Sequence, residues 1–130
     1  MTFKDTEELR ILTEAEEICD EIWDEVIGWD YFVRDTVGKQ LVKAADSIGS
    51  NIAESQGRFH PSDVINFLYY ARGSLKETSF WLRRVKRRKL MSEAKCNQIM
   101  ERITNLAPQL NAFIQSQRKR KSQQTNKPTN

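Results

Sequence analysis

An unbroken apolar repeat between residues 64 and 85 constrains the fold of this 130-residue chain more than any other feature. Its steps alternate between four and three residues, which is the spacing of a buried stripe on an α-helix. The stripe consists of Val64, Leu68, Ala71, Leu75, Thr78, Leu82 and Val85. Such a helix needs an apolar surface to pack against, so the sequence predicts a bundle of helices.

The N-terminal segment predicts another helix, which begins near Thr6 as an N-cap. The stripe expected to be buried consists of Leu9, Leu12, Ala15, Cys19, Ile22 and Val26. A further apolar set, Ile11, Ile18, Trp23 and Trp29, lies off that stripe. One packed side cannot hold both sets, so we expect this helix to contact something beyond its own bundle.

Two more segments carry apolar residues at helical spacing. Residues 32–56 repeat Val37, Leu41, Ala44, Ala45, Ile48 and Ile52, and Gly57 is expected to end this helix. Pro61 fits the first turn of the helix that carries the long repeat. The last helix is expected to follow an N-cap at Ser92 and to bury Cys96, Ile99, Ile103, Leu106, Leu110 and Phe113. Pro108 lies inside this pattern and predicts a kink or an early end.

Four helices joined by short loops predict an all-α, up-down-up-down four-helix bundle over residues 1–115. Residues 116–130 are polar and basic and are expected to form a disordered basic tail. No run approaches eighteen apolar residues, so we expect no contact with a membrane. The N-terminus lacks a secretory pattern and two cysteines do not make a disulfide framework, which favours a cytoplasmic protein.

Motifs for catalysis and metal binding are missing from the sequence. The single histidine, His60, excludes a di-iron bundle, which needs Glu-x-x-His pairs on facing helices. Cys19 and Cys96 lack the CxxC spacing that would indicate zinc. Neither a glycine-rich phosphate loop nor a nucleophile elbow occurs. We therefore expect no enzyme activity, no metal and no cofactor.

Charge is distributed unevenly along the chain, whose formal net charge is +3. Residues 1–30 contain eleven acidic and two basic side chains, whereas the remaining hundred contain seven acidic and nineteen basic ones. This segregation indicates a surface that binds a polyanion, or contact between the acidic and basic surfaces of different subunits.

Ten of the 21 basic residues lie in two clusters. The first consists of Arg83, Arg84, Lys86, Arg87, Arg88 and Lys89, and the second of Arg118, Lys119, Arg120 and Lys121. Cations stabilise a helix C-terminus, but six in seven positions exceed what a cap needs. We predict that the first cluster binds nucleic acid through its phosphates, with Arg84, Arg87 and Arg88 on one helix face. The second cluster either extends this contact as a flexible arm or serves solubility.

Two polar sets and four aromatic residues each allow two interpretations. Ser47, Asn51 and Glu54 share a side of one helix, as do Ser74 and Glu77 of the next. They form either a ligand or catalytic carboxylate pair or, as we favour, a structural polar network that fixes helix register. Every buried member would need a partner, because an unpaired polar group costs about 1–3 kcal/mol. The aromatic side chains of Tyr69, Tyr70, Phe80 and Trp81 could stack on bases, but their spacing favours a core or subunit interface.

Two segments carry a family resemblance. Residues 43–54 read Lys-Ala-Ala-Asp-Ser-Ile-Gly-Ser-Asn-Ile-Ala-Glu, and residues 71–77 read Ala-Arg-Gly-Ser-Leu-Lys-Glu, with Arg58 and Phe67-Leu68 between them. Together they resemble the four helix bundle protein family over about residues 30–110. Some members of that family are encoded in intervening sequences of bacterial large-subunit ribosomal RNA genes. Ser55 departs from the family pattern, which has glycine there.

The resemblance implies a four-helix bundle that assembles into a homopentameric ring. The family is similar in fold to the accessory proteins of diversity-generating retroelements, which bind nucleic acid and a reverse transcriptase. We therefore predict a homo-oligomeric accessory protein that binds nucleic acid, with a reverse transcriptase as a further partner. The alternative is a protein-interaction scaffold with no nucleic-acid role, in which the acidic first helix meets the basic surface of a neighbour.

Overall fold

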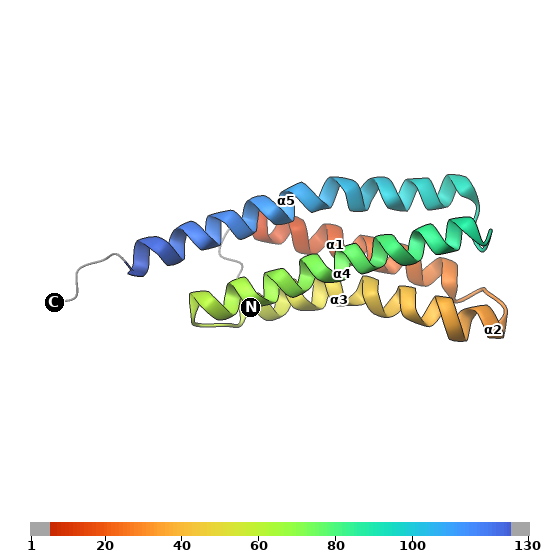
Figure 1. The fold of residues 1–130 in the computed structure, drawn as a ribbon, viewed down its shortest axis with the longest axis horizontal. Helices are drawn as coiled ribbons and strands as arrows, with labels where there is room; N and C mark the ends of the chain where they lie inside the picture. The colour runs from red at the N-terminus through yellow and green to blue at the C-terminus, as the bar shows by residue number, and fades with distance from the viewer. Residues whose placement is uncertain (1–5, 126–130) are drawn as a thin grey trace.

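The computed structural model describes residues 6–125, which fold into four long antiparallel helices and contain no strand (Figure 1). The long helices are α1 (Thr6–Val26), α3 (Lys39–Gln56), α4 (Pro61–Arg87) and α5 (Glu93–Thr125). A short helix α2 (Tyr31–Val33) and a π-helical turn η1 (Arg34–Gly38) lead into α3. The predicted all-α architecture is confirmed, and none of the described helices is long and apolar enough to cross a membrane.

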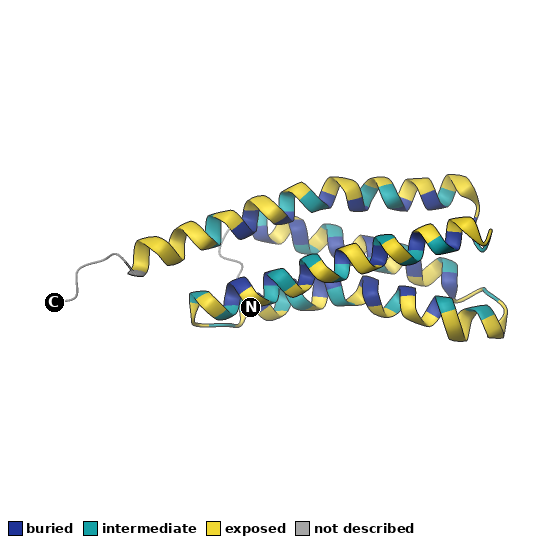
Figure 2. Cartoon of the chain, viewed as in Figure 1, coloured by how far each residue is buried: buried dark blue, intermediate teal, exposed yellow. Residues whose placement is uncertain are grey.

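Each long helix packs mainly against two neighbours. α1 contacts α3 and α5, and α4 contacts the same two helices, so α1 and α4 lie diagonally across the bundle. Figure 2 shows buried residues on the inner sides of the helices and exposed residues outside. Each helix therefore contributes one buried stripe to a single core.

The stripes predicted for α4 and α5 are confirmed. All the predicted α4 positions from Val64 to Val85 are buried, including Thr78, whose Oγ1 donates to the Ser74 carbonyl at 2.7 Å. The predicted α5 positions from Cys96 to Phe113 are buried as well. The Ser92 hydroxyl accepts a hydrogen bond from the backbone N–H of Lys95 at 3.1 Å, as an N-cap does.

The stripe predicted for α1 is wrong in part. Its buried apolar residues are Ile11, Ala15, Ile18, Ile22 and Val26. Leu9 is 43% exposed, whereas Leu12 and Cys19 are half-buried. The predicted and observed stripes share Ala15, Ile22 and Val26. Both follow helical spacing, so spacing alone cannot say whether Leu12 and Cys19 or Ile11 and Ile18 complete the buried side.

The segment before α3 departs from a regular α-helix. Residues 34–38 form the π-turn η1, where Thr36 Oγ1 donates to the Phe32 carbonyl at 2.7 Å. Gly38 is buried against α1, and a β-carbon there would lie 2.7 Å from Val26 Cγ1. The missing side chain therefore allows α1 and the start of α3 to approach closely. The predicted helix over residues 32–56 is correct in position, and it ends at Gly57 as expected.

Helix α5 is longer than predicted. It continues past Pro108 to Thr125, so an early end is wrong, and residues 116–125 are helical rather than a disordered tail. Phe113 and Ile114 are buried beyond the proline and hold this part of α5 against the bundle. The two halves of α5 differ in direction in Figure 1, as expected for a helix with an internal proline. Residues 126–130 of the predicted tail lie outside the described residues.

Three carboxylates of α1 converge on Arg102 of α5. The guanidinium donates from Nε to Glu14 at 3.1 Å, from Nη1 to Glu21 at 3.0 Å, and from Nη2 to Glu17. Lys95 Nζ also pairs with Glu21, at 2.8 Å. Part of the acidic charge of α1 is therefore neutralised within the chain. One interpretation of the sequence was that the acidic surface contacts a different subunit, and these carboxylates do not need such a contact.

We expect Glu21→Gln to lower the free energy of unfolding by about 1–2 kcal/mol at neutral pH, because charge-assisted hydrogen bonds are lost. Burial alone would raise the pKa of Glu21, but hydrogen bonds from Lys95 and Arg102 hold this pKa below its ordinary value of 4.5. A lowered pKa stabilises the fold only while the carboxylate is ionised. The difference between wild type and variant should therefore shrink as the pH falls below about 4.5, as urea unfolding across a pH series would measure.

Glu17→Gln is the matched control, because Glu17 contacts the same guanidinium from a side chain that is 52% exposed. Its effect on stability should be much smaller at every pH, since exposed ion pairs contribute little. Equal effects of the two substitutions, or a Glu21→Gln difference that grows in acid, would contradict this role of Glu21.

Candidate nucleic-acid interface

Four cations at the end of α4 surround an open hollow of about 680 Å³. Its lining consists of Arg83, Lys86, Arg87 and Lys89, together with Met91 and Glu93. Lys86 is partly neutralised, because its Nζ lies 3.9 Å from Glu93 and donates to Asn97 Oδ1 at 2.9 Å. The other three cations are exposed and have no ion-pair partner within residues 6–125. We call this site the basic hollow.

The remaining cations of the first cluster are placed differently. The Arg84 guanidinium lies over the Phe80 ring, 5.8 Å from its centroid, and its Nε is buried without an acceptor in the described chain. Arg88 is exposed at the C-cap of α4. Arg87 lines the hollow with Arg83 and Lys86, whereas the Arg84 guanidinium lies over Phe80. Of the three arginines predicted to share a face, Arg87 alone lines the hollow.

A tight helix end holds the basic hollow in place. The N–H of Leu90 donates to the Val85 carbonyl at 3.0 Å, and the N–H of Lys89 donates to the Lys86 carbonyl at 3.2 Å. These two bonds form a Schellman motif. Lys89 occupies the left-handed position of this motif with φ of 58°, where glycine is usual.

The second basic cluster lies at the other end of the bundle. Arg118 and Lys121 line a hollow of about 610 Å³ with residues of the first turns of α4, among them Ser62 and Tyr69. About 25 residues of α5 separate this site from the start of that helix, which corresponds to about 37 Å. Within one chain the two clusters cannot form one contact surface, and the second is carried by a helix rather than a flexible arm (Figure 1).

The polar set on α3 bonds within its own helix. Ser47 Oγ donates to the Lys43 carbonyl at 2.7 Å, and Asn51 Nδ2 donates to the Ser47 carbonyl at 2.8 Å. The Glu54 carboxylate pairs with Arg58 one turn later. Serine and asparagine side chains in helices commonly satisfy themselves in this way on the preceding turn.

The polar set on α4 does not complete a network. Glu77 is exposed and Ser74 is half-buried, and across residues 6–125 no hydrogen bond joins either side chain to α3. The structural polar network predicted between the two helices is therefore not formed within one chain, because its α3 members are satisfied locally.

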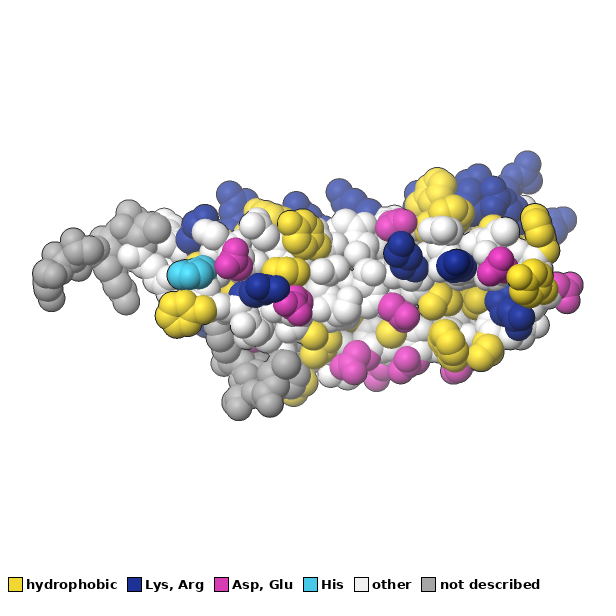
Figure 3. Space-filling model, turned by 90° about the horizontal axis from the view of Figure 1, so that it is seen from below, with side chains coloured by type: hydrophobic (Ala, Val, Ile, Leu, Met, Phe, Trp, Pro, Cys, Tyr) yellow, Lys and Arg dark blue, Asp and Glu magenta, His cyan; other side chains and the backbone are white. Residues whose placement is uncertain are grey.

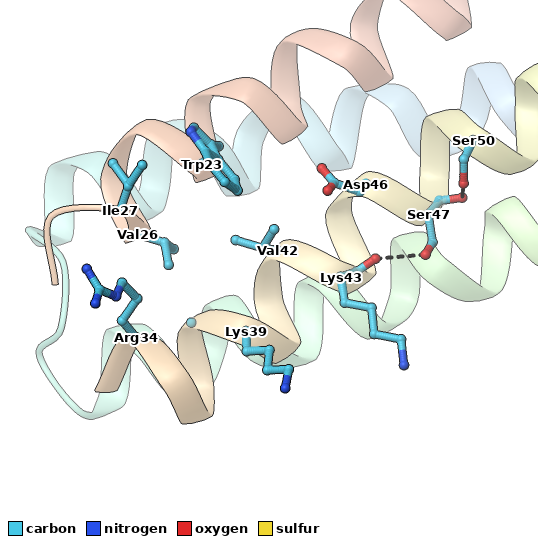
Figure 4. Close-up of a pocket in the computed structure, with 11 residues that line it drawn as sticks. Trp23, Val26, Ile27, Arg34, Lys39, Val42, Lys43, Asp46, Ser47 and Ser50 are labelled. Carbon is cyan, nitrogen blue, oxygen red and sulfur yellow. Dashed lines mark hydrogen bonds between the residues drawn. The ribbon is translucent and has the colours of Figure 1, made fainter. Parts of the chain in front are cut away.

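A groove between α1 and α3 is the site that sequence reasoning missed (Figure 4). Trp23 of α1, Ile27 just after this helix and Val42 of α3 line a hollow of about 550 Å³. The lining also includes the cations Arg34, Lys39 and Lys43. A second hollow of about 330 Å³ adjoins it and shares Asp46 and Ser50 with it. We call the two together the α1–α3 groove. Of the second apolar set of α1, only Trp23 lines this groove, because Ile11 and Ile18 are buried in the core. Trp23 was therefore the one correct signal of an exposed apolar surface on α1.

The groove also contains Cys19. Burial, followed by the neighbouring carboxylate of Asp46, raises the pKa of this thiol to about 12. The thiol is therefore protonated at neutral pH and is a poor nucleophile or metal ligand. Within the described part of the chain, no group of three or more histidine, cysteine or acidic residues is placed to hold a metal ion.

We expect Lys89→Gly to raise the free energy of unfolding by about 0.5–1 kcal/mol, because glycine avoids the strain of a β-carbon at positive φ. This gain corresponds to a rise of about 2–4 °C in Tm, measurable by thermal unfolding monitored by circular dichroism.

Lys89→Ala is the control, since it removes the same charge but keeps the β-carbon. It should leave Tm unchanged or lower it. A gain from alanine as large as that from glycine would mean that charge repulsion, and not backbone strain, limits stability at this position.

The chain is similar to known proteins in both sequence family and fold. Residues 7–112 match the family model described as 23S rRNA-intervening sequence protein. A similar solved structure is that of a protein of unknown function from the S23 ribosomal protein family of Bacteroides thetaiotaomicron. It superposes with a TM-score of 0.76 at 22% identity, over 85% of this chain and 99% of that chain, which supports the fold alone. No curated protein matches the chain in sequence. The family match covers most of the sequence, and the chain therefore belongs to the 23S rRNA-intervening sequence protein family.

Proposed function

We propose that this protein is a cytoplasmic, non-enzymatic, homo-oligomeric accessory protein that binds nucleic acid through the basic hollow. The observation that carries the proposal is the set of exposed cations Arg83, Arg87 and Lys89, which have no ion-pair partner within the described residues.

Binding at the basic hollow would be directed to phosphates. Lysine and arginine side chains that neutralise phosphates release condensed counterions, so the affinity depends steeply on salt. Such contacts fix position on the nucleic acid without reading its sequence. We therefore expect weak sequence selectivity.

Assembly would multiply this charge. The family resemblance supports a homopentameric ring, in which the basic hollow would recur five times. A nucleic acid that contacts several copies at once gains affinity without any new type of contact. A reverse transcriptase is the partner enzyme that the same resemblance suggests, and it would share the bound nucleic acid.

Fluorescence anisotropy with labelled single-stranded RNA, duplex DNA and an RNA–DNA hybrid tests the proposal across a salt series. Arg83→Gln with Arg87→Gln should weaken binding to each probe. The slope of log affinity against log salt should fall by about 0.7–0.9 for each phosphate that the variant no longer neutralises. Arg118→Gln with Lys121→Gln, measured in parallel, decides whether the C-terminal cluster contributes.

Arg10→Gln with Lys76→Gln is the matched control, because it removes two exposed charges away from both clusters. Binding should be retained in this variant. Absence of binding at low salt, or equal losses in the control and the hollow variant, would refute a specific role for the basic hollow.

A further inference from the structure

We propose that the α1–α3 groove binds a small amphipathic anion, namely a free medium-chain fatty carboxylate. The carboxylate head lies beside Arg34 and Lys39, and the acyl chain lies along the groove against Trp23. This inference goes beyond the proposed function and depends neither on nucleic-acid binding nor on self-association.

The interior of the larger hollow is apolar. Trp23 is 50% exposed and Ile27 is 53% exposed, and the half-buried Val42 faces them from α3 (Figure 4). The hydroxyl of Ser47, on the same wall, donates to the Lys43 carbonyl of its own helix at 2.7 Å. Its hydrogen is therefore not offered to a ligand, and the walls favour an apolar body whose burial removes exposed aromatic and aliphatic area from water.

Three cations line one end of this hollow. Arg34, Lys39 and Lys43 are exposed, and none of them has an ion-pair partner within residues 6–125. In Figure 4, the Arg34 side chain extends from η1 toward the end of α1, whereas the Lys39 and Lys43 side chains extend along the outer rim of α3. Asp46 is the one carboxylate among the described residues of this lining. The η1 end of the groove therefore has an excess of positive charge beside an apolar surface.

The charge changes sign along the groove. Glu16 lines the adjoining hollow, and Asp46 lies where the two hollows join. A carboxylate head is repelled from these two side chains and attracted by Arg34 and Lys39, so a ligand has one favoured orientation. The α3 wall extends for about 17 Å over residues 39–50, which leaves room for an extended acyl chain. Figure 3 shows apolar and basic side chains together at the end of the bundle that carries α2, and acidic side chains along the lower edge.

The groove and the basic hollow suit different anions. The larger hollow of the groove has a volume of about 550 Å³, inside the range of about 300–1,000 Å³ that is typical of small-molecule sites. Such sites are mainly apolar and use a few polar groups to orient the ligand. The basic hollow has Met91 as the one apolar residue of its described lining, so it suits a polar polyanion. An apolar chain with a single negative head suits the groove.

Fluorine NMR of the full chain labelled with fluorotryptophan tests the site, because Trp23 lines the groove and Trp81 of α4 does not. Trp23→Phe assigns the Trp23 signal. Decanoate, kept below the concentration at which it forms micelles, should shift this signal and leave that of Trp81 unchanged. We expect a Kd of about 0.1–1 mM for so small a ligand in an open groove.

The role of charge is tested with ligands of the same chain length. Decan-1-ol and decylammonium lack the negative head and should bind at least about threefold more weakly than decanoate. Arg34→Gln with Lys39→Gln should weaken decanoate binding by at least about threefold and leave decan-1-ol binding unchanged.

Arg10→Gln with Lys76→Gln serves again as the matched control, since it removes two exposed charges outside the groove. It should keep the wild-type affinity for decanoate. An unshifted Trp23 signal, which a groove covered by a second copy of the chain would also give, overturns the proposal. Equal binding of the three ligands, or equal losses in the control and the Arg34–Lys39 variant, overturns it as well. If decanoate binds as expected but none of the three nucleic-acid probes binds, the ligand site stands and the nucleic-acid role fails.

Discussion

The core of a four-helix bundle accepts one apolar stripe from each helix, and α1 carries two. Ile11, Ile18 and Ile22 fill the core, which leaves Trp23 and Ile27 outside it. At the end of α1, Val26 packs so closely against Gly38 that a β-carbon at position 38 would not fit between them. The α1–α3 groove is therefore a consequence of how the core is filled.

The charged side chains of α1 and α4 are also divided between different sides of each helix. Arg102 neutralises three carboxylates of α1 that face α5. Glu16, Asp20 and Asp24, on another side of α1, form no ion pair among the described residues. On α4, the side toward the loop holds the basic hollow, and the side toward Phe80 holds Arg84. Within one helical turn of α4, Arg87 lines the basic hollow and Arg84 lies over Phe80. Neighbouring cations of one sequence cluster can therefore contact different surroundings.

The helices and most of the core could be predicted from the sequence, because the spacing in α4 and α5 fits only one stripe. The full buried stripe of α1 could not be predicted in this way. Two overlapping sets of apolar residues in α1 both fit the helical period, and only the position of the opposite helix decides which set is buried. The π-turn at residues 34–38 has no signal in apolar spacing. The end of α5 could not be predicted, because the polar and basic composition of residues 116–130 is typical of a solvated tail. In the structure, Phe113 and Ile114 are buried and anchor a helix that continues to Thr125. For the candidate site, the sequence identified the cations but not their division between the hollow and Phe80, which depends on angles around the helix.

Helix α5 carries its last cations on a stiff support. A flexible arm loses conformational freedom when a partner orders it, which costs about 0.5–1.5 kcal/mol for each immobilised long side chain in addition to the backbone. A helix has its backbone ordered in advance, so only the side-chain part of that loss remains. Arg118 and Lys121 lie three residues apart and line the same hollow beside the start of α4. The helical extension thus fixes the backbone positions of Arg118 and Lys121 about 4.5 Å apart along the helix axis before any partner is present.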